Sequence, residues 1–264
     1  MKKEVKKIIR DIKSIKIQGA RNIAKSALKA YHLEKTKKVK QALLNARPTE
    51  PMLHHVLNLL GKYDYKKILA HFDSAQTAIN KLVFKLIKNN STIFTHCHST
   101  NVTKALIYAK KYGKKFQVYN TETRPLFQGR RTAKELSRHG IKVTTFIDSG
   151  ASLAIKKSDL VLFGADAVLK SGAINKIGSG MFAEIAKDNK KPVFIVADSW
   201  KFSPKNIPIE QRALNEVWNN APEKIKINNP AFEFIQGKFI KAIVSELGML
   251  SVDNFSKKAG KLLT

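Results

Sequence analysis

The feature that most constrains the fold is an alternation of short apolar runs with amphipathic stretches after residue 91. Such alternation is typical of parallel βαβ units, because a helix carries the chain back to the start of each next parallel strand. Strands are predicted at Thr92–His96, Phe116–Asn120, Val143–Ile147, Leu160–Gly164 and Val193–Ala197. Helices are predicted at about 100–112, 130–139, 150–157 and 179–188, with another near 237–247. The sequence therefore predicts an α/β domain with an open parallel sheet.

Residues 1–90 predict a helical region instead, because their apolar residues recur at helical spacing. The series are Ile8, Ile9, Ile12, Ile15 and Ile17, then Leu53, Val56, Leu57 and Leu60, then the run from Ala75 to Ile87. Asn89, Asn90 and Ser91 break the pattern. We therefore expect an N-terminal helical region over residues 1–90, followed by an α/β domain over residues 91–264 that carries most of the functional site.

The charge balance is strongly basic, with 49 Lys and Arg against 20 Asp and Glu and a net charge of +29. Such a field attracts anions, such as sugar phosphates, nucleotides or nucleic acid. If it is only a generic solvated surface, RNA binding should be weak and steeply dependent on salt.

Cysteine count and hydropathy exclude several classes of protein. A single cysteine rules out an intramolecular disulfide framework and a zinc site built from clustered cysteines. No apolar run approaches the length of a membrane span, and the basic N-terminus lacks the apolar core of a signal peptide. We expect a soluble, cytoplasmic protein with no membrane partner.

Ligands of open parallel sheets bind beyond the carboxyl ends of the strands. Cys97 follows the first predicted strand and precedes a predicted helix. A thiol there can have a lowered pKa and act as base or nucleophile, or it can be a small buried apolar residue. Asp166 ends the fourth strand, where it could hold a proton as a general acid or cap the next turn. Asp148 and Asp198 end two other strands, so position alone does not separate the three carboxylates.

Two further patterns near these strands are weaker. His96 and His98 fall on one strand face, but no third metal ligand is visible at useful spacing, so no metal site is predicted. The segment Asn175–Gly180 opens a predicted helix, where glycine backbone N–H groups and the charge of Lys176 could hold a phosphate.

That glycine segment also has a rival interpretation. Gly178, Gly180 and Ala183 match a dinucleotide-binding pattern, and Asp198 lies twenty residues after Gly178. The glycines of such a site should follow their strand closely, but thirteen residues separate Gly178 from the end of the predicted strand at Gly164. No nicotinamide cofactor is therefore expected.

Taken together, the strand-end strings TETRPLFQGRRTAKEL, DSGA, GADAVLKSGAINKIG and ADSWKF resemble one superfamily. It contains the initiation-factor 2B regulatory subunits, methylthioribose-1-phosphate isomerase and archaeal ribose-1,5-bisphosphate isomerase. The resemblance runs from about residue 11 to 254. It implies an N-terminal helical region on a Rossmann-like parallel sheet domain, assembled as a homodimer or homohexamer.

The isomerase branches of this superfamily carry a cysteine after the first strand and an aspartate in a GAD string. This chain has both, as Cys97 in THCHS and Asp166, and the string THCHS is most similar to that of the ribose bisphosphate enzymes. The resemblance implies that Cys97 is a thiolate base and that Asp166 is the acid that handles the oxygen protons. It implies neither a metal nor a redox cofactor.

The resemblance also implies the residues that bind substrate. Phosphate contacts come from Arg47, Ser99, Lys176 and Lys201, and sugar contacts come from Gln128 and Asn175. An Arg-Gly-Ala string that grips a phosphate in the isomerases reads Gln18-Gly19-Ala20 here. The arginine is thus replaced by Gln18, leaving the Gly19 N–H and the nearby Arg21 to take over its contact.

These features favour an aldose–ketose isomerase that converts ribose 1,5-bisphosphate to ribulose 1,5-bisphosphate in nucleotide (AMP) salvage. The alternative is a non-catalytic subunit similar to initiation factor 2B, which binds a phosphorylated ligand or a translation partner. An isomerase for another sugar 1-phosphate is a third interpretation.

Overall fold

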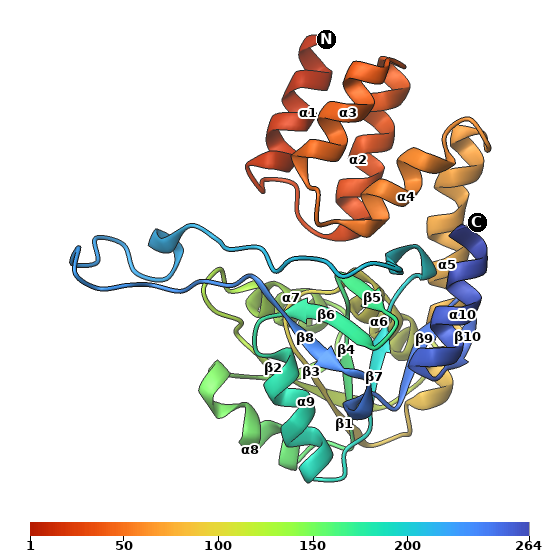
Figure 1. Cartoon of the computed structure of the whole chain (residues 1–264). Coiled ribbons are helices and arrows are strands. Elements are labelled where there is room, and N and C mark those ends of the chain that lie inside the picture. Colours follow the sequence, from red (N-terminus) through yellow and green to blue (C-terminus); the bar gives the residue numbers. More distant parts are fainter. Residues whose placement is uncertain (264) are drawn as a thin grey trace.

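The computed structural model describes residues 1–263, which form a helical part followed by a sheet covered with helices (Figure 1). The helices of the first part are α1 (Lys3–Lys13), α2 (Ala20–Leu33), α3 (Lys37–Ala46), α4 (Pro51–Leu59) and α5 (Tyr65–Leu86). The predicted N-terminal helical region is therefore present. No helix in the described chain is long and apolar enough to cross a membrane.

Seven strands form the main sheet, in the order β10-β9-β7-β4-β1-β2-β3 (Figure 1). They are β1 (Ser91–Thr95), β2 (Phe116–Thr121), β3 (Lys142–Phe146), β4 (Leu160–Phe163), β7 (Val193–Val196), β9 (Ala242–Ser245) and β10 (Gly248–Leu250). All neighbours are parallel except the β9–β10 pair. The predicted α/β fold with a parallel sheet is confirmed, and all five predicted strands are present.

Helices cover both faces of this sheet, so its central strands are buried on both sides. The helices that follow β1 in the chain are α6 (Thr100–Lys111), α7 (Gln128–Arg138), α8 (Ala151–Lys156), α9 (Ser179–Asp188) and α10 (Val252–Leu263). Along β4, Leu160 and Leu162 pack with α5, α6 and α7, whereas Val161 and Phe163 pack with α8, α9 and α10. Burial on both faces explains why these strands read as continuous apolar runs.

The helix predicted near 237–247 is wrong. This stretch forms a short 3₁₀ turn, η4 (Gly237–Phe239), and then strand β9, which pairs with β7 and β10. A short apolar run gives no periodicity that separates a buried strand from a buried helix. The β-branched Ile243 and Val244 fit the strand, and all four residues of β9 are buried.

A second, three-stranded sheet was not anticipated by the apolar pattern. It consists of β5 (Ala167–Leu169), β6 (Gly172–Lys176) and β8 (Phe232–Gln236), in the order β5-β6-β8 with antiparallel pairing. Between β7 and β8 the chain passes through η2 (Ser199–Lys201) and η3 (Leu214–Glu216), and part of it extends away from the body (Figure 1). The small sheet matters for function because β6 carries Asn175 and Lys176.

The first part has its own apolar core, which meets the sheet domain within α5. Ile68 and Phe72 of α5 pack in the core of the helical part, whereas Ile79 and Val83 pack against the sheet. Helix α1 ends at Lys13, so Ile15 and Ile17 lie outside it although their spacing predicted helix. A domain boundary after residue 90 remains a prediction, since the two cores join across α5.

The strand order reverses beside β1, and this reversal positions the site. From β1 the chain adds β2 and β3 on one side and then crosses to add β4 and β7 on the other. Such a switch point leaves a crevice at the carboxyl ends of the two central strands, which is where open α/β sheets bind ligands. Cys97 follows β1 and Asp166 follows β4, so both predicted catalytic residues lie at this crevice.

Candidate active site

A cavity of about 270 Å³ lies at the switch point, between the helical part and the sheet. All twelve residues that the sequence nominated line it: Gln18, Gly19, Ala20, Arg21, Arg47, Cys97, Ser99, Gln128, Asp166, Asn175, Lys176 and Lys201. They come from the starts of α2, α6 and α7, the end of α3, the loops after β1 and β4, strand β6 and η2. The cavity therefore brings together residues from both halves of the chain.

The backbone of Cys97 is fixed by two hydrogen bonds in an unusual conformation. Its φ of 63° lies in the left-handed region, where non-glycine residues are uncommon and tend to mark functional sites. Its N–H donates to Thr123 Oγ1 at 3.0 Å, and its carbonyl accepts from Thr132 Oγ1 at 2.8 Å. These bonds offset the local strain and hold the Cys97 side chain at the cavity wall.

The surroundings of Cys97 do not produce the lowered thiol pKa that its position before a helix made possible. Burial raises the pKa of the Cys97 thiol to about 12, and the nearby Asp166 carboxylate adds to the rise. The ammonium of Lys176 acts in the opposite direction, but it does not offset the loss of hydration. Cys97 is thus a neutral thiol at rest, and a thiolate requires that its proton be taken up nearby.

The structure separates the three strand-end aspartates by their contacts. Asp148 accepts hydrogen bonds from the backbone N–H groups of Thr123 (2.8 Å) and Arg124 (2.6 Å), so it holds a loop. Asp198 accepts from the Trp200 N–H and caps η2. Asp166 alone of the three lines the cavity.

The surroundings of Asp166 act on the pKa of its carboxyl in opposite directions. Burial raises its pKa, and the nearby cations Lys201, Arg47 and Lys176 oppose that rise. A protonated carboxyl surrounded by cations can donate its proton and then remain stable as a carboxylate. Asp166 therefore has the properties of a general acid.

Two buried lysines face the same cavity. Lys176 is 6% exposed on β6, and burial lowers its pKa. Lys201 is equally buried, and its Nζ donates to the Ala165 carbonyl at 2.5 Å, directly beside Asp166. Neither ammonium has a carboxylate partner at ion-pair distance within residues 1–263, so both are available to an anionic ligand.

The arginines of the cavity differ from the lysines in being paired. Arg21 donates to the Phe72 carbonyl at 2.8 Å and to Asp73 at 2.6 Å, and Arg47 binds Glu210 at 2.9 and 3.3 Å. Substrate contacts from Arg21 and Arg47 remain predictions, because any phosphate would share these guanidinium groups with carboxylates.

Two further cavity arginines were missed by the sequence reasoning. Arg131 lies one turn into α7, and Arg212 follows η2 and pairs with Glu216 at 2.6 Å. Arg131 sits in the quoted string QGRRTAKEL, whose second arginine could have been considered. Arg212 lies in an irregular segment with no motif, so only the fold reveals it.

Two helix N-termini meet at the cavity. Gly19, with φ of 83°, precedes α2, and Ser99 caps α6 by accepting from the Val102 N–H at 3.4 Å. Helix N-termini present free N–H groups and a partial positive charge, which favour phosphates. Close packing fixes the second of them: a Cβ on Gly164, after β4, would lie 2.4 Å from Ser99 Oγ, so this position requires glycine.

The glycine segment before α9 does not form the phosphate cradle that its sequence suggested. The carboxylate of Glu233 on β8 binds the Gly180 N–H at the start of α9, and the N–H groups of Gly178 and Met181 also stabilise it. An internal carboxylate thus occupies the place of the phosphate. The dinucleotide pattern fails for a second reason, because the strand before Gly178 is β6 of the small antiparallel sheet.

The histidines beside Cys97 are held by the protein itself. His96 Nε2 donates to the Ile177 carbonyl at 2.9 Å, and its Nδ1 accepts from the Thr121 hydroxyl. His98 Nδ1 lies 3.0 Å from Thr132 Oγ1. Since Thr132 donates its proton to the Cys97 carbonyl, His98 Nδ1 is the donor in this bond. Both ring nitrogens of His96 are engaged, which leaves no metal ligand there.

The buried His96 predicts a loss of stability in acid. Burial lowers the pKa of His96 to about 4, whereas an exposed histidine has a pKa near 6.5. The unfolded chain therefore binds more protons between these values, and the folded state loses stability as the pH falls. Between pH 7 and pH 5 the loss from this residue should be about 2 kcal/mol. Urea unfolding of the parent and of His96→Gln at pH 7 and pH 5 isolates the contribution of His96 to the free energy of unfolding. If the parent and His96→Gln lost the same stability between these pH values, the lowered pKa of His96 would be contradicted.

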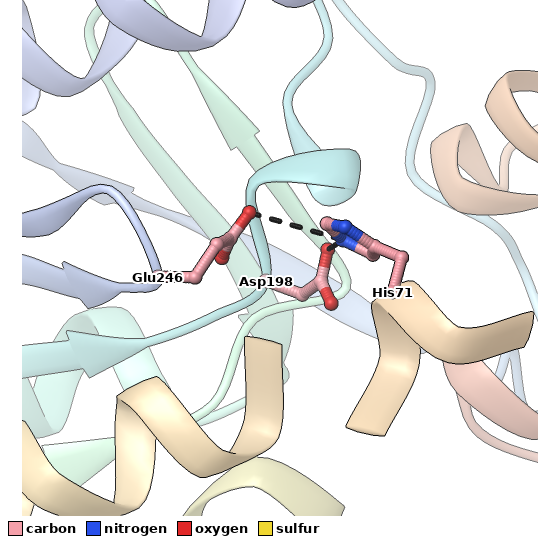
Figure 2. Close-up of side chains that lie close together, drawn as sticks. All are labelled: His71, Asp198 and Glu246. Carbon is pink, nitrogen blue, oxygen red and sulfur yellow. Dashed lines mark hydrogen bonds and ion pairs between the residues drawn. The ribbon is translucent and has the colours of Figure 1, made fainter. Parts of the chain in front are cut away.

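One cluster has the composition of a metal site but lies outside the cavity. The ligand atoms of His71, Asp198 and Glu246 lie within 4.8 Å of one another (Figure 2). His71 Nε2 is 3.1 Å from Asp198 and 3.8 Å from Glu246, and Glu246 accepts from the Ser199 N–H. The cluster is thus satisfied by its own hydrogen bonds. It holds η2, whose Trp200 stacks on the His71 ring at 3.6 Å and whose Lys201 enters the cavity.

Three polar atoms in the cavity wall are buried without a hydrogen-bond partner in the described chain: Arg47 Nε, Glu50 Oε1 and Gln128 Oε1. Each costs about 1–3 kcal/mol if it stays unsatisfied. A ligand rich in oxygens and hydroxyls would supply the missing partners. Glu50 was not nominated by the sequence, because an acidic residue at a helix start is common, where the helix dipole favours a carboxylate.

Known proteins share the sequence and the fold of this chain. A sequence profile described as the Initiation factor 2 subunit family matches residues 5–252. The ribose 1,5-bisphosphate isomerase of Archaeoglobus fulgidus is 32% identical over 94% of this chain and 90% of its own. That of Methanocaldococcus jannaschii is 34% identical, with 93% and 91% covered.

A solved structure shows the same fold. The translation initiation factor eIF-2B of Pyrococcus horikoshii has a TM-score of 0.84 at 23% identity, covering 95% of this chain and 98% of its own. At that identity the likeness is one of fold only. With the profile match and the two relatives, the chain is a member of the Initiation factor 2 subunit family.

Proposed function

We propose that this protein is a sugar-phosphate aldose–ketose isomerase that converts ribose 1,5-bisphosphate to ribulose 1,5-bisphosphate. The observation that carries the proposal is the cavity, where a thiol and a buried carboxyl face two buried, unpaired lysines. The relatives that share about a third of its sequence carry this activity in their names. The presence of both Cys97 and Asp166 favours the enzyme over a binding subunit.

The charge distribution of the cavity suits a substrate with two phosphates. Lys176, Lys201 and Arg131 have no carboxylate partner at ion-pair distance among residues 1–263. The N-termini of α2 and α6 supply two separate groups of backbone N–H donors. Because charge-assisted contacts are about twice as strong as neutral ones, these groups would account for most of the affinity. Gln128 and Asn175 would orient the sugar hydroxyls.

The raised pKa of Cys97 sets the first step of the mechanism. Transfer of its proton to Asp166 gives a thiolate and a neutral carboxyl, and it removes the repulsion that the ionised Asp166 exerts on the thiolate. The remaining thiolate is stabilised by the ammonium of Lys176. This internal transfer produces the base and the acid together.

The isomerisation then needs only proton movements. The Cys97 thiolate takes the proton from C2, the bond between C1 and the ring oxygen breaks, and the ring oxygen receives a proton from a carboxyl. In the second half the C2 hydroxyl loses its proton to a carboxylate, and Cys97 returns its proton to C1. Electrons and protons balance, since every group of the protein ends as it began.

The test is an assay of purified protein with ribose 1,5-bisphosphate, methylthioribose 1-phosphate and ribose 1-phosphate, with product identified by nuclear magnetic resonance. We expect ribulose 1,5-bisphosphate as the main product and a clear preference for the bisphosphate. Turnover of another sugar 1-phosphate instead would move the substrate assignment to that sugar. Calorimetric binding of the bisphosphate without any turnover would favour the non-catalytic subunit.

We also propose that the protein assembles as a homodimer or homohexamer. Leu214, Trp218 and Ile225 are about half exposed, and they belong to the stretch of chain between η2 and β8. A stretch with several exposed large apolar side chains is a candidate interaction surface. Sedimentation velocity measures the assembly directly, and a monomer at micromolar concentration would contradict the proposal.

A further inference from the structure

Glu50 is the buried carboxyl of the cavity that the reaction scheme above leaves without a role. It precedes Pro51 at the start of α4, and its own N–H donates to the Arg47 carbonyl at 3.2 Å. Proline fixes the backbone at the first helical position, so the direction of the Glu50 side chain is set locally. The residue is 5% exposed and lines the same cavity as Asp166.

The carboxyl of Glu50 is incompletely satisfied by the protein. Its Oε1 has no hydrogen-bond partner in the part of the chain that the structure describes. The Met52 N–H in the first turn of α4 interacts with the Glu50 carboxyl and lowers its pKa, but this contact leaves Oε1 without a partner. The unsatisfied oxygen, buried at the wall of the cavity, instead indicates a partner that arrives with the ligand.

The surroundings keep Glu50 able to exchange protons near neutral pH. Burial raises its pKa to about 8, and the Asp166 carboxylate contributes to the rise. Lys201, Arg47 and the Met52 N–H oppose the rise, so the protonated and ionised forms of Glu50 lie close in free energy. Groups whose pKa values lie near the working pH are the most effective general acids and bases. Glu50 and Asp166 thus form an interacting pair of carboxyls.

The chemistry of ring opening calls for two such groups. One oxygen of the sugar, that of the ring, must gain a proton as its bond to C1 breaks, whereas the C2 hydroxyl must lose one. These oxygens are bonded to different carbons, and a single carboxyl would have to serve both in turn. Two interacting carboxyls that pass a proton between them can serve the two oxygens from different positions.

On the basis of the isomerase function proposed above, we propose that Glu50 is a second acid–base group of the site. Once Asp166 has taken up the Cys97 proton, the Glu50–Asp166 pair holds two protons. Glu50 gives its proton to the ring oxygen and is reprotonated by Asp166, whose carboxylate then accepts the proton of the C2 hydroxyl. The C2 proton travels to C1 through Cys97, so the pair again holds two protons and no oxidant or further reactant is consumed.

The kinetic test compares the parent with Glu50→Gln, which keeps the size of the side chain but cannot exchange a proton. We expect kcat to fall about 100-fold or more, with the calorimetric Kd for ribose 1,5-bisphosphate changed less than about threefold. Glu50→Asp should recover part of the lost turnover, since it restores the carboxyl at a shorter reach. Glu184→Gln, the same substitution on the exposed face of α9, should behave as the parent.

Two outcomes of this comparison overturn the proposal. Parent-like turnover of Glu50→Gln would show that Glu50 exchanges no proton in the reaction. A weakened Kd with unchanged kcat would make Glu50 a binding group only. Circular dichroism checks that each variant is folded. If Glu50→Gln is poorly folded, Glu50→Asp decides the question: it should be folded, with a kcat below that of the parent, and a parent-like kcat would overturn the proposal.

A spectroscopic arm separates this proposal from the proposed function. Infrared spectra of the parent at neutral pH should contain a protonated-carboxyl band that Glu50→Gln removes, and in Asp166→Asn the remaining Glu50 signal should titrate at lower pH. If the parent shows the protonated-carboxyl band but turns over no sugar phosphate, the proposed isomerase function is wrong, whereas the protonated Glu50 is still supported. Turnover with no such band at neutral pH would defeat the role of Glu50 alone.

Discussion

Cys97→Ser is expected to abolish turnover while leaving the affinity for ribose 1,5-bisphosphate within about threefold of the parent. The substitution keeps the shape of the side chain and the hydrogen bonds of its backbone to Thr123 and Thr132. It replaces a thiol with a hydroxyl that ionises far less readily. Because burial already raises the pKa of the thiol to about 12, a hydroxyl at this place has no accessible anionic form.

The loss should be about 1,000-fold or more in kcat, since it removes the group that carries the proton between carbons. The measurement is ribulose bisphosphate formation beside calorimetric titration of the same samples. Lys201→Ala serves as the contrasting variant, because it removes a cation from the cavity and should weaken binding of substrate and product. Near-parent turnover by Cys97→Ser would mean that another group is the base.

The resting state of Cys97 changes how the site should be understood. A thiolate kept permanently beside Asp166 would be exposed to oxidants and would repel the phosphates of an incoming substrate. A neutral thiol avoids both effects, and its proton has a local acceptor in the carboxylate that raises its pKa. The reactive pair therefore forms by a transfer within the site, with Lys176 as the counter-charge.

Much of the site could be predicted from sequence, because parallel strands end at one edge of a sheet. Cys97 and Asp166 are 69 positions apart in the chain, yet each follows one of two adjacent central strands, β1 and β4. Once the alternation of apolar runs gave the strands, the meeting of their ends followed from the geometry of the fold. The choice among Asp148, Asp166 and Asp198 could not be made in this way, since it depends on which backbone N–H groups each one meets.

The charge pairs of the site were beyond the reach of sequence patterns. Arg47 binds Glu210, and the start of α9 binds Glu233, although each partner lies far along the chain. Such pairs depend on how irregular segments cross the sheet, which no periodicity records. The small sheet of β5, β6 and β8 is a similar case, because strands this short give little pattern. Glu50 was missed for a different reason, since acidic residues are common at helix starts and no motif marked this one.

Asp166→Asn is expected to separate the two effects that one carboxylate exerts in this cavity. The amide keeps the volume of the side chain but can neither donate an acid proton nor accept one. We expect kcat to fall about 100-fold or more with little change in substrate affinity, as for other general acids. The same substitution removes a negative charge that raises the pKa of the Cys97 thiol, so that pKa should fall.

This second effect can be measured without any substrate. The rate at which iodoacetamide alkylates Cys97 at mildly alkaline pH follows the thiolate fraction, and each unit by which the pKa falls raises that fraction about tenfold. Asp166→Asn should therefore react faster with iodoacetamide while it turns over more slowly, and Asp188→Asn, at the exposed end of α9, should change neither rate. An unchanged alkylation rate in Asp166→Asn would show that the two side chains do not interact. If both rates fell, Asp166 would be supporting the fold of the site rather than its chemistry, because only a charge effect makes the thiol more reactive as the enzyme becomes slower.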